Sequence, residues 1–330
     1  MKTFAGIDIG AQSVVLCLRR GGRTLSAETF ARTEAGYRAI IRKLGRKVAC
    51  VVLEATGIYY LDLAMALQRA GLPVAVINPR SFHHFAKLKL NTSKTDAVDA
   101  ALLAEYAECM KPALWRAPDE VLLGLRDIGR QINRLTAART QAKNRLHALR
   151  AKASTLPLLI EDEVEGIAQL DQRLQRLTEA ALELLGQQPL YQQHLLNLQQ
   201  AKGIGQTSAI ALLAELCVLP QDMRAAQVSR YAGLDVRLCQ SGTSVNKPGR
   251  LSKAGNAYLR SALYMPALSA VRHDPNAKAF YLALQLRGKK KIQALCAVMR
   301  KYLTGIWACI KLGVPFDSSK LFSEKHLADA

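Results

Sequence analysis

The sequence predicts an α/β domain over residues 1–118, a coiled-coil helical arm over 119–200 and an all-α domain over 201–330. Three observations predict this division. Short apolar runs alternate with helical patterns in the first part, apolar residues at 3-4 spacing run through the middle, and helical patterns dominate the last part. A chain of 330 residues also suits two or three domains better than one.

The first part begins with three short apolar stretches, and the hairpin signal Gly21-Gly22 separates the second from the third. Two further strand patterns alternate with helix patterns. The expected strands are Thr3–Gly10, Ser13–Arg20, Arg23–Ala31, Val48–Leu53 and Pro73–Ile77, and the expected helices are Glu34–Leu44 and Tyr59–Ala70. Three antiparallel strands followed by alternating helix and strand is the order of a ribonuclease-H-like sheet.

The middle carries a coiled-coil seam over Leu125–Leu149, interrupted by Arg139. We expect a helix over Asp119–Ala153, about 50 Å long at 1.5 Å per residue, with Pro157 ending it. The same spacing resumes from Leu170. The first helix is basic and the second acidic, so opposite charges favour their pairing, within one chain or between two. A helical spacer and a dimerisation arm both fit this pattern.

Residues 201–330 are mostly helical by pattern, with one loop rich in Ser, Gly and Thr over Gln240–Lys253. Gly203-Ile204-Gly205 lies between a helix that ends at Ala201 and a helix over Thr207–Leu219. Such a turn resembles the hairpin of helix-hairpin-helix modules, where backbone N–H groups at a helix N-terminus face DNA phosphates. A plain turn between helices fits equally well.

The charge balance points to a polyanionic partner. The chain carries 46 Lys and Arg against 26 Asp and Glu, a net charge of +20, which suits nucleic acid or a membrane surface. The longest apolar stretch, Ala209–Pro220, is interrupted by Glu215 and falls far short of the roughly 20 residues of a membrane span. We therefore expect nucleic acid and no membrane. Seven scattered cysteines without a C-x-x-C pair exclude a zinc ribbon and favour a reducing, cytoplasmic setting.

Four acidic residues carry the strongest signal for chemistry. Asp8 interrupts an apolar strand and Glu54 closes another, while Asp96 and Asp99 are three apart and share one face of a helix that starts there. A buried acid must be paired or must bind a cation. Oxygen-only ligation suits Mg²⁺ or Mn²⁺, and two such ions roughly 4 Å apart stabilise the entering and leaving oxygens in phosphodiester cleavage.

Each acid alone also has a structural explanation. Asp96 suits a helix cap beside Thr95, and Glu54 suits a salt bridge at the end of a strand. All four acids in this order are harder to explain in that way. The motif Gly6–Gly10 also occurs in the first strand of sugar kinases and actin-like ATPases. Those proteins need a second phosphate-binding loop in a repeated domain, and no such motif occurs after residue 118.

Ser241 lies in the hydroxyl-rich stretch Gln240–Ser244. A serine there could attack phosphorus while nearby cations stabilise the developing charge. From the residues alone, a nucleophile is the weaker interpretation, because three serines are candidates for it and no histidine lies near in the sequence to act as a base. Hydroxyls that contact phosphate, or a helix N-cap at Ser252, explain the stretch better. We expect nucleic-acid contacts from Lys94, Arg130, Arg134, Lys202, Gly203, Gly205, Lys247, Arg250, Lys253, Lys289, Lys290 and Lys291.

Taken together, these motifs resemble those of insertion-sequence-110 family transposases, the DEDD recombinases described as bridge-RNA-guided, and the resemblance runs nearly end to end. The N-terminal motifs are Gly6-Ile7-Asp8, Glu54-Ala55-Thr56-Gly57, Val76-Ile77-Asn78-Pro79 and Lys94–Ala100. The C-terminal motifs are Gly203-Ile204-Gly205, Tyr231-Ala232-Gly233-Leu234, Ser241-Gly242, Ser252–Gly255, Leu263–Ala267 and Gly313–Asp317.

The resemblance implies a RuvC-like domain, a coiled-coil segment and a helical transposase domain. It implies a divalent-metal site of Asp8, Glu54, Asp96 and Asp99, and makes Ser241 the nucleophile that joins to a DNA 5′-phosphate, with a Holliday-junction-like intermediate. It further implies donor and target DNA, a structured guide RNA that pairs with both, and a homo-oligomer, dimer or tetramer, in which one subunit's serine meets another's metal site. If pairing with the RNA selects the DNA sequence, the protein needs only to bind nucleic-acid backbones, which suits a basic chain with few aromatic residues.

Two positions depart from the family's pattern. Lys202 replaces a proline before the Gly-Ile-Gly turn, and Gln240 stands where an acidic residue often precedes the serine. Other functions stay open. A DNA invertase of the pilin-inverting type shares these motifs, a junction-resolving nuclease would need the acids but not Ser241, and a non-catalytic nucleic-acid-binding protein would need neither.

Overall fold

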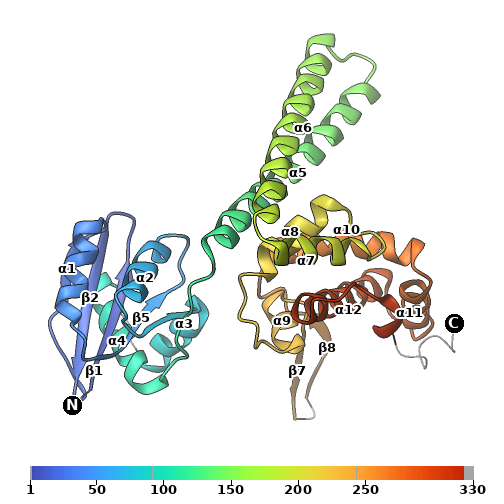
Figure 1. Ribbon diagram of the computed structural model, residues 1–330. Coiled ribbons are helices and arrows are strands. Elements are labelled where there is room, and N and C mark those ends of the chain that lie inside the picture. Colours follow the sequence, from blue (N-terminus) through green and yellow to red (C-terminus); the bar gives the residue numbers. More distant parts are fainter. Residues whose placement is uncertain (1, 91–92, 243, 323–330) are drawn as a thin grey trace. The chain divides into compact units, whose positions relative to one another are not determined.

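The computed structural model describes residues 2–90, 93–242 and 244–322 (Figure 1). The chain folds into two compact units, Met1–Ala117 and Pro118–Ala330. The further division of the second unit into an arm over 119–200 and a domain over 201–330 stays a prediction.

One sheet of mixed direction forms the centre of the first unit. Its strands are β1 (Thr3–Ile9), β2 (Ser13–Arg20), β3 (Arg23–Thr24), β4 (Glu28–Ala31), β5 (Val48–Glu54) and β6 (Val74–Ile77). They lie in the order β3-β2-β1-β5-β6, and β4 also pairs with β2. Strand β1 is antiparallel to β2 and parallel to β5, which is parallel to β6. The α/β class predicted for this part is confirmed.

Helices cover both faces of this sheet. They are α1 (Glu34–Leu44), α2 (Tyr60–Arg69), α3 (Pro79–Leu88) and α4 (Asp96–Met110). Ile7 and Leu53 lie in a core with α1 and α2, whereas Cys50 and Val52 lie in a core with α3 and α4. Successive side chains of a strand point to opposite faces, so a residue's place in β1 or β5 shows which helices cover it.

The expected third strand, Arg23–Ala31, is wrong because the structure breaks it into β3 and β4. Thr24 pairs with Arg19 and Glu28 with Leu16. Between these two pairs, the chain covers four residues from Thr24 to Glu28, whereas β2 covers three from Arg19 to Leu16. The extra residue is a bulge that interrupts the ladder, and the alternation of apolar residues does not reveal it.

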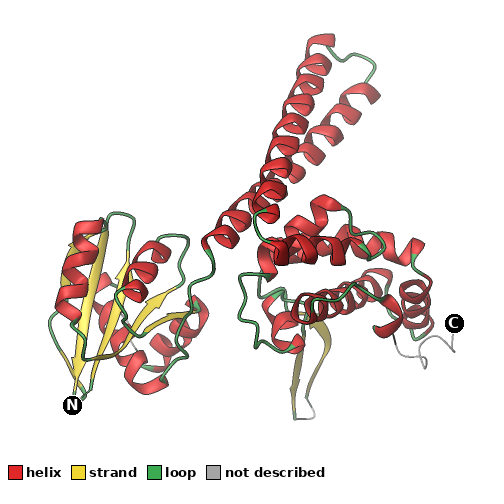
Figure 2. Ribbon diagram, in the orientation of Figure 1, coloured by secondary structure: helices red, strands yellow, loops and turns green. Residues whose placement is uncertain are grey.

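The second unit begins with two long helices, α5 (Glu120–Ala151) and α6 (Pro157–Gly186), which lie antiparallel (Figure 2). Pro157 was expected to end the first helix, but α5 ends at Ala151 and Pro157 begins α6. Proline suits the first helical position, where the missing N–H has no intrahelical acceptor to bond.

Two ion pairs join these helices. Arg139 pairs with Asp171 and Arg145 with Glu163, each at 2.6 Å. The predicted attraction between a basic and an acidic helix therefore operates within one chain. Dimerisation through this helix pair stays a prediction.

The rest of the second unit is a helical assembly around one core. Its helices are α7 (Pro189–Gln199), α8 (Gln206–Leu216), α9 (Ala225–Tyr231), α10 (Ala257–His273), α11 (Pro275–Leu286), α12 (Lys291–Leu312) and a short 3₁₀ helix (Ser318–Lys320). Buried residues of α5, α6, α8, α10 and α12 belong to the same cluster, so the base of the long helix pair shares its core with the C-terminal helices. Over the described ranges, no helix is both long enough and apolar enough to cross a membrane.

The segment expected as a Ser-, Gly- and Thr-rich loop is instead a β-hairpin. Strand β7 (Val236–Ser241) pairs antiparallel with β8 (Val245–Leu251), and every residue of β7 is exposed. The apolar and charged residues of 234–238 alternate, but the alternation stops before Gln240, and β8 contains Pro248 and Gly249, so the pattern does not predict two paired strands. The N-cap expected at Ser252 is also wrong, because α10 begins at Ala257 and Asn256 caps it by accepting a hydrogen bond from Leu259 N.

Candidate functional site

Asp8 and Glu54 lie at the same edge of the sheet. Strands β1 and β5 are parallel neighbours, with Ile7 beside Leu53. The next residue of each strand is therefore Asp8 or Glu54, at the carboxyl end of its strand. Because Ile7 and Leu53 face α1 and α2, the two acids lie on the opposite face, which α3 and α4 cover.

Gly6 allows α4 to lie directly on β1. A Cβ at Gly6 would lie 2.2 Å from the carbonyl oxygen of Ala100, so no other residue fits without a shift of the helix. Gly6 is on the same face as Asp8. Asp96 and Asp99 lie in the first turn of α4, just before Ala100. The contact therefore brings the two aspartates of α4 towards the strand end that carries Asp8.

Thr95 holds the beginning of α4. Its side chain accepts a hydrogen bond from Val98 N, and its backbone is extended, so Thr95 is the N-cap. The alternative explanation of Asp96 as the cap is therefore wrong. Asp96 is the first helical residue and is exposed.

The acids influence one another electrostatically. The pKa of Asp8 is raised to about 6, with burial as the largest cause, followed by the negative charges of the other three acids. The pKa of Asp99 is also raised, again mainly by burial, with Glu54 and Asp96 adding to the rise and Lys94 opposing it. Mutual repulsion of this kind requires the four carboxylates to lie in one neighbourhood.

The carboxylates have few protein partners. Thr56 donates its hydroxyl to Glu54 Oε1 at 2.5 Å. Among the described residues, no Lys or Arg forms an ion pair with any of the four acids, so the salt bridge considered for Glu54 is wrong. Within the same residues, no three Asp, Glu, His or Cys side chains are already arranged to hold a metal ion. The cluster thus has a net negative charge that only Lys94 offsets, without forming an ion pair, and its side chains would have to close around a cation.

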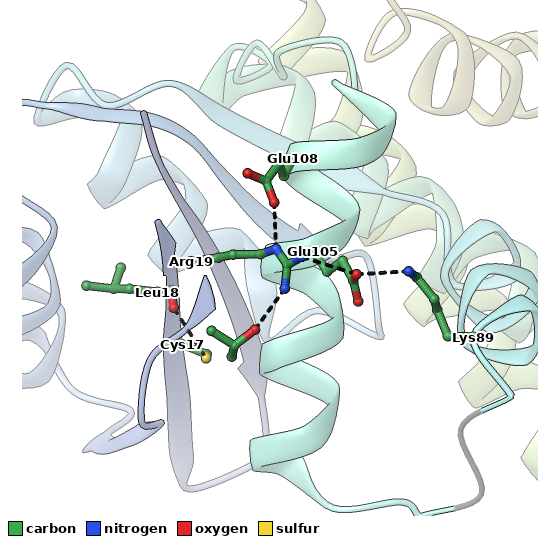
Figure 3. A network of polar contacts seen from close by, with 7 residues as sticks. Cys17, Leu18, Arg19, Lys89, Glu105 and Glu108 are labelled. Carbon is green, nitrogen blue, oxygen red and sulfur yellow. Dashed lines mark hydrogen bonds and ion pairs between the residues drawn. The ribbon is translucent and has the colours of Figure 1, made fainter. Parts of the chain in front are cut away.

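A polar network holds the second half of α4 against the sheet (Figure 3). Arg19 of β2 donates to Glu108 at 2.6 Å, to Glu105 at 3.3 Å and to Thr24 at 2.9 Å. Lys89, next to the end of α3, pairs with Glu105 at 2.9 Å. The network and the close contact at Gly6 together set the position of α4, and so of its two aspartates. No pattern in the sequence points to these residues, because their partners come from distant segments.

Ser241 is exposed at the end of β7. Gly242, the next residue, has a φ of +52°, a region that favours glycine. Two other serines were candidates. Ser244 is exposed in the turn, whereas Ser252 donates its hydroxyl to Asp235 at the base of the hairpin. The structure therefore leaves Ser241 and Ser244 as accessible hydroxyls.

The base of the hairpin is closely packed. A Cβ at Gly255 would lie 2.2 Å from the carbonyl oxygen of Tyr231, and Gly233 has a φ of +69°. Lys253 N donates to the carbonyl oxygen of Gly233 at 3.1 Å. The motifs on either side of the hairpin thus pack against each other and fix the direction in which Ser241 is presented.

Two of the predicted nucleic-acid contacts have partners inside the protein. Arg130 binds Glu215 through two hydrogen bonds of 2.6 and 3.0 Å, and Glu215, only 2% exposed, also accepts a hydrogen bond from Asn256. Arg134 donates to the hydroxyl of Tyr258 at 3.1 Å. The sequence pattern of α5 did not reveal these partners. Nucleic-acid contact by either arginine stays a prediction.

The Gly-Ile-Gly turn lies between α7 and α8, as expected. Gly203 has a φ of +89°, and a Cβ there would lie 2.7 Å from the carbonyl oxygen of Pro266, so glycine is required for close approach to α10. Gly205 is the N-cap of α8 and has open space around it. The exposed residues among the other predicted contacts are Lys94, Lys202, Arg250, Lys253, Lys289, Lys290 and Lys291, and the side chain of Lys247 lies outside what the structure describes.

Comparison with known proteins gives the family. A model described as a transposase, for the DEDD transposases of IS110, matches residues 5–151, and a model of the IS116/IS110/IS902 transposase family matches residues 196–282. A pilin gene-inverting protein of Moraxella bovis is 29% identical over 96% of this chain and 98% of its own length. The transposase for insertion sequence element IS1111A of Coxiella burnetii is 25% identical over 92% and 88%. A 43.6 kDa protein of insertion element IS110 from Streptomyces coelicolor is 24% identical over 96% and 95%. The chain therefore belongs to the IS110 family of transposases, DNA recombinases that cleave and rejoin DNA strands.

Proposed function

We propose that this chain cuts DNA by a serine-linked mechanism, in which Ser241 is the nucleophile and Asp8, Glu54, Asp96 and Asp99 hold divalent cations. The observation that carries the proposal is the group of four acids, drawn from two parallel strands and one helix N-terminus, whose charges raise the pKa of Asp8. Four carboxylates offset only by Lys94 repel one another, so this cluster lowers the stability of the fold unless it binds a cation.

The donor set fits Mg²⁺ or Mn²⁺, with two ions per site. All four ligands are carboxylates, the ligands that hard cations prefer. When bound, the ions would stabilise the charge on the attacking and leaving oxygens. Thr56 would orient Glu54, and the close contact between Gly6 and α4 would hold Asp96 and Asp99 near Asp8. The rise in the pKa of Asp8 means that a cation must displace a proton at mildly acidic pH.

Ser241 is suited to reach a phosphate because it stands at the exposed end of a ribbon with a rigid base. Its hydroxyl oxygen would attack phosphorus, form a serine phosphodiester with the DNA 5′-phosphate and release a 3′-hydroxyl. Rejoining is the reverse attack by a 3′-hydroxyl, which frees the serine. The bond energy is conserved in the serine ester, so no external energy source is needed.

Trapping of the covalent intermediate tests this mechanism. Labelled DNA that carries the element's ends should form a denaturant-resistant adduct with the wild-type protein, and Ser241→Ala should abolish the adduct. Ser244→Ala is the matched control, since it removes an exposed hydroxyl from the same turn. An adduct that persists in Ser241→Ala, or disappears only in Ser244→Ala, would remove Ser241 from this role.

We further propose that a structured RNA with segments complementary to donor and target DNA guides the protein, which works in the cytoplasm as a dimer or tetramer. The net charge of +20 supports a chain that holds nucleic-acid backbones. Sequencing the RNA that co-purifies with the protein tests this, and the expected result is one dominant species encoded beside the gene. A random sample of cellular RNA would contradict it.

Site-specific DNA inversion is the second candidate function. The pilin gene-inverting protein of Moraxella bovis aligns over nearly the whole of both chains. A plasmid with two recombination sites in inverted orientation distinguishes the two functions. An invertase would flip the intervening segment and keep the plasmid intact, whereas a transposase would release or insert the element.

A further inference from the structure

Arg32 lies between the two loops that follow the candidate metal-binding strands. Its Nε donates to the carbonyl oxygen of Ala11 at 2.7 Å, in the loop after β1. Its guanidinium carbon lies 4.8 Å from the ring centroid of Tyr59, in the loop after β5. Asp8 is the last but one residue of β1 and Glu54 is the last residue of β5, so Arg32 lies at the edge of the sheet that carries the acids.

The guanidinium of Arg32 is positioned without being neutralised. Its backbone N–H also donates to the carbonyl oxygen of Gln12 at 3.0 Å, which fixes the start of the side chain. Arg32 forms no ion pair in the described part of the chain. Two other partly buried arginines, Arg19 and Arg130, bind carboxylates.

This arrangement suits a phosphate. Ala11 occupies Nε of Arg32, and the side chain also interacts with the hydroxyl of Tyr37. A guanidinium has five in-plane N–H donors, so others remain for the oxygens of a phosphodiester, whose geometry its planar fork matches. Beside Tyr59, the side chain of Ile58 is 71% exposed, and Tyr59 itself is 39% exposed. These two side chains offer an apolar surface for the sugar or base next to a bound phosphate.

We propose that Arg32, held by Ala11 and Tyr59, binds a backbone phosphate of the DNA, next to the phosphate at which the strand is cut. Ile58 and Tyr59 pack against the adjoining nucleotide. The proposal rests on the proposed DNA-cleaving site. It adds a strand-positioning contact that orients the substrate over the acids.

The salt dependence of DNA binding tests the contact. Affinity of the full chain for a labelled DNA duplex is measured over a range of salt concentrations in Ca²⁺. Arg32→Ala should lower the affinity about tenfold and make the slope of log K against log salt less negative by about 0.9, the value for one phosphate contact. Arg32→Lys should keep the wild-type slope, because the charge remains. The control is Arg42→Ala, an exposed arginine that lies about 12 Å along α1 from the start of that helix, and it should change neither quantity.

Photo-crosslinking tests the location. Benzoylphenylalanine in place of Ile58 should crosslink to the duplex, and Arg32→Ala should reduce the yield strongly. An unchanged salt slope in Arg32→Ala, no crosslink at position 58, or a loss of RNA binding with unchanged DNA binding would overturn the proposal. If the Arg32→Ala protein does not fold, the crosslinker at position 58 in otherwise wild-type protein still tests whether DNA lies beside Tyr59. Asp8→Asn separates the two proposals, because retained cleavage in that variant refutes the metal site whatever Arg32 does.

Discussion

Replacement of Asp8 by asparagine is expected to stabilise the metal-free protein while it abolishes cleavage. In the folded chain the pKa of Asp8 rises from 3.8 to about 6. Between these two values the folded state binds more protons than the unfolded state, so the free energy of unfolding falls as pH rises through that window. Once Asp8 is fully ionised, this shift corresponds to at most about 3 kcal/mol, and because Asp8 is only half-buried, solvent screening lowers the cost to the folded state to about 2 kcal/mol.

Asparagine removes that cost because it has the same shape and no charge. At pH 7 to 8 in chelator, Asp8→Asn should raise the melting temperature of the first unit by on the order of 10 °C. Near pH 4 the difference should vanish. Asp62→Asn, in the first turn of α2, is the control, and it should give no gain because Asp62 lies outside the cluster.

Differential scanning calorimetry of the full chain in chelator, at several pH values, measures the difference. Mn²⁺ should then stabilise the wild-type protein and leave Asp8→Asn unchanged. The reasoning is refuted if Asp8→Asn is less stable than wild type at pH 8, or if the difference between the two is the same at pH 4 and pH 8.

Three further substitutions test how the structure holds the two candidate sites. Gly6→Ala places a Cβ against the backbone of α4 and should destabilise the first unit by about 3 kcal/mol or more in urea unfolding, with metal binding lost; wild-type stability would contradict the contact. Arg19→Met should cost about 1–3 kcal/mol by leaving Glu108 without its partner and Glu105 with Lys89 alone, whereas Arg38→Met, in an exposed pair, should stay within about 0.5 kcal/mol of wild type. Arg130→Met should cost about 3–5 kcal/mol by leaving Glu215 unpaired, and equal stability of both proteins would show that the pair is dispensable.

The sequence could predict most of the first unit because its local signals agree with its fold. Buried strands such as Val48–Glu54 read as continuous apolar runs, and α1 has the predicted bounds Glu34–Leu44. Asp8 and Glu54 were identifiable because a charge within or at the end of an apolar strand conflicts with burial, and Asp96 and Asp99 because their spacing places them on one face of a helix. Their approach to one another could not be predicted, since it depends on Gly6 and on the contacts of α4 with strands about 90 residues away.

The hairpin that carries Ser241 could not be predicted, because its local sequence signals are weak. The alternation of apolar and charged residues at the start of β7 is short, and β8 has a proline and a glycine in its middle, so pairing between the two strands defines the hairpin. The partner of Arg130 was equally hidden, because Glu215 lies 85 residues away. Sequence patterns show which face of a helix is polar, but they do not show which polar side chain meets another element.

The central claim is that the acids of β1, β5 and α4 form one divalent-cation site. Anomalous scattering from crystals of the full chain grown with Mn²⁺ tests it. We predict a strong peak bounded by the carboxylate oxygens of Asp8, Glu54, Asp96 and Asp99. Bound Mn²⁺ that lies only elsewhere, with these four side chains apart, would contradict the account.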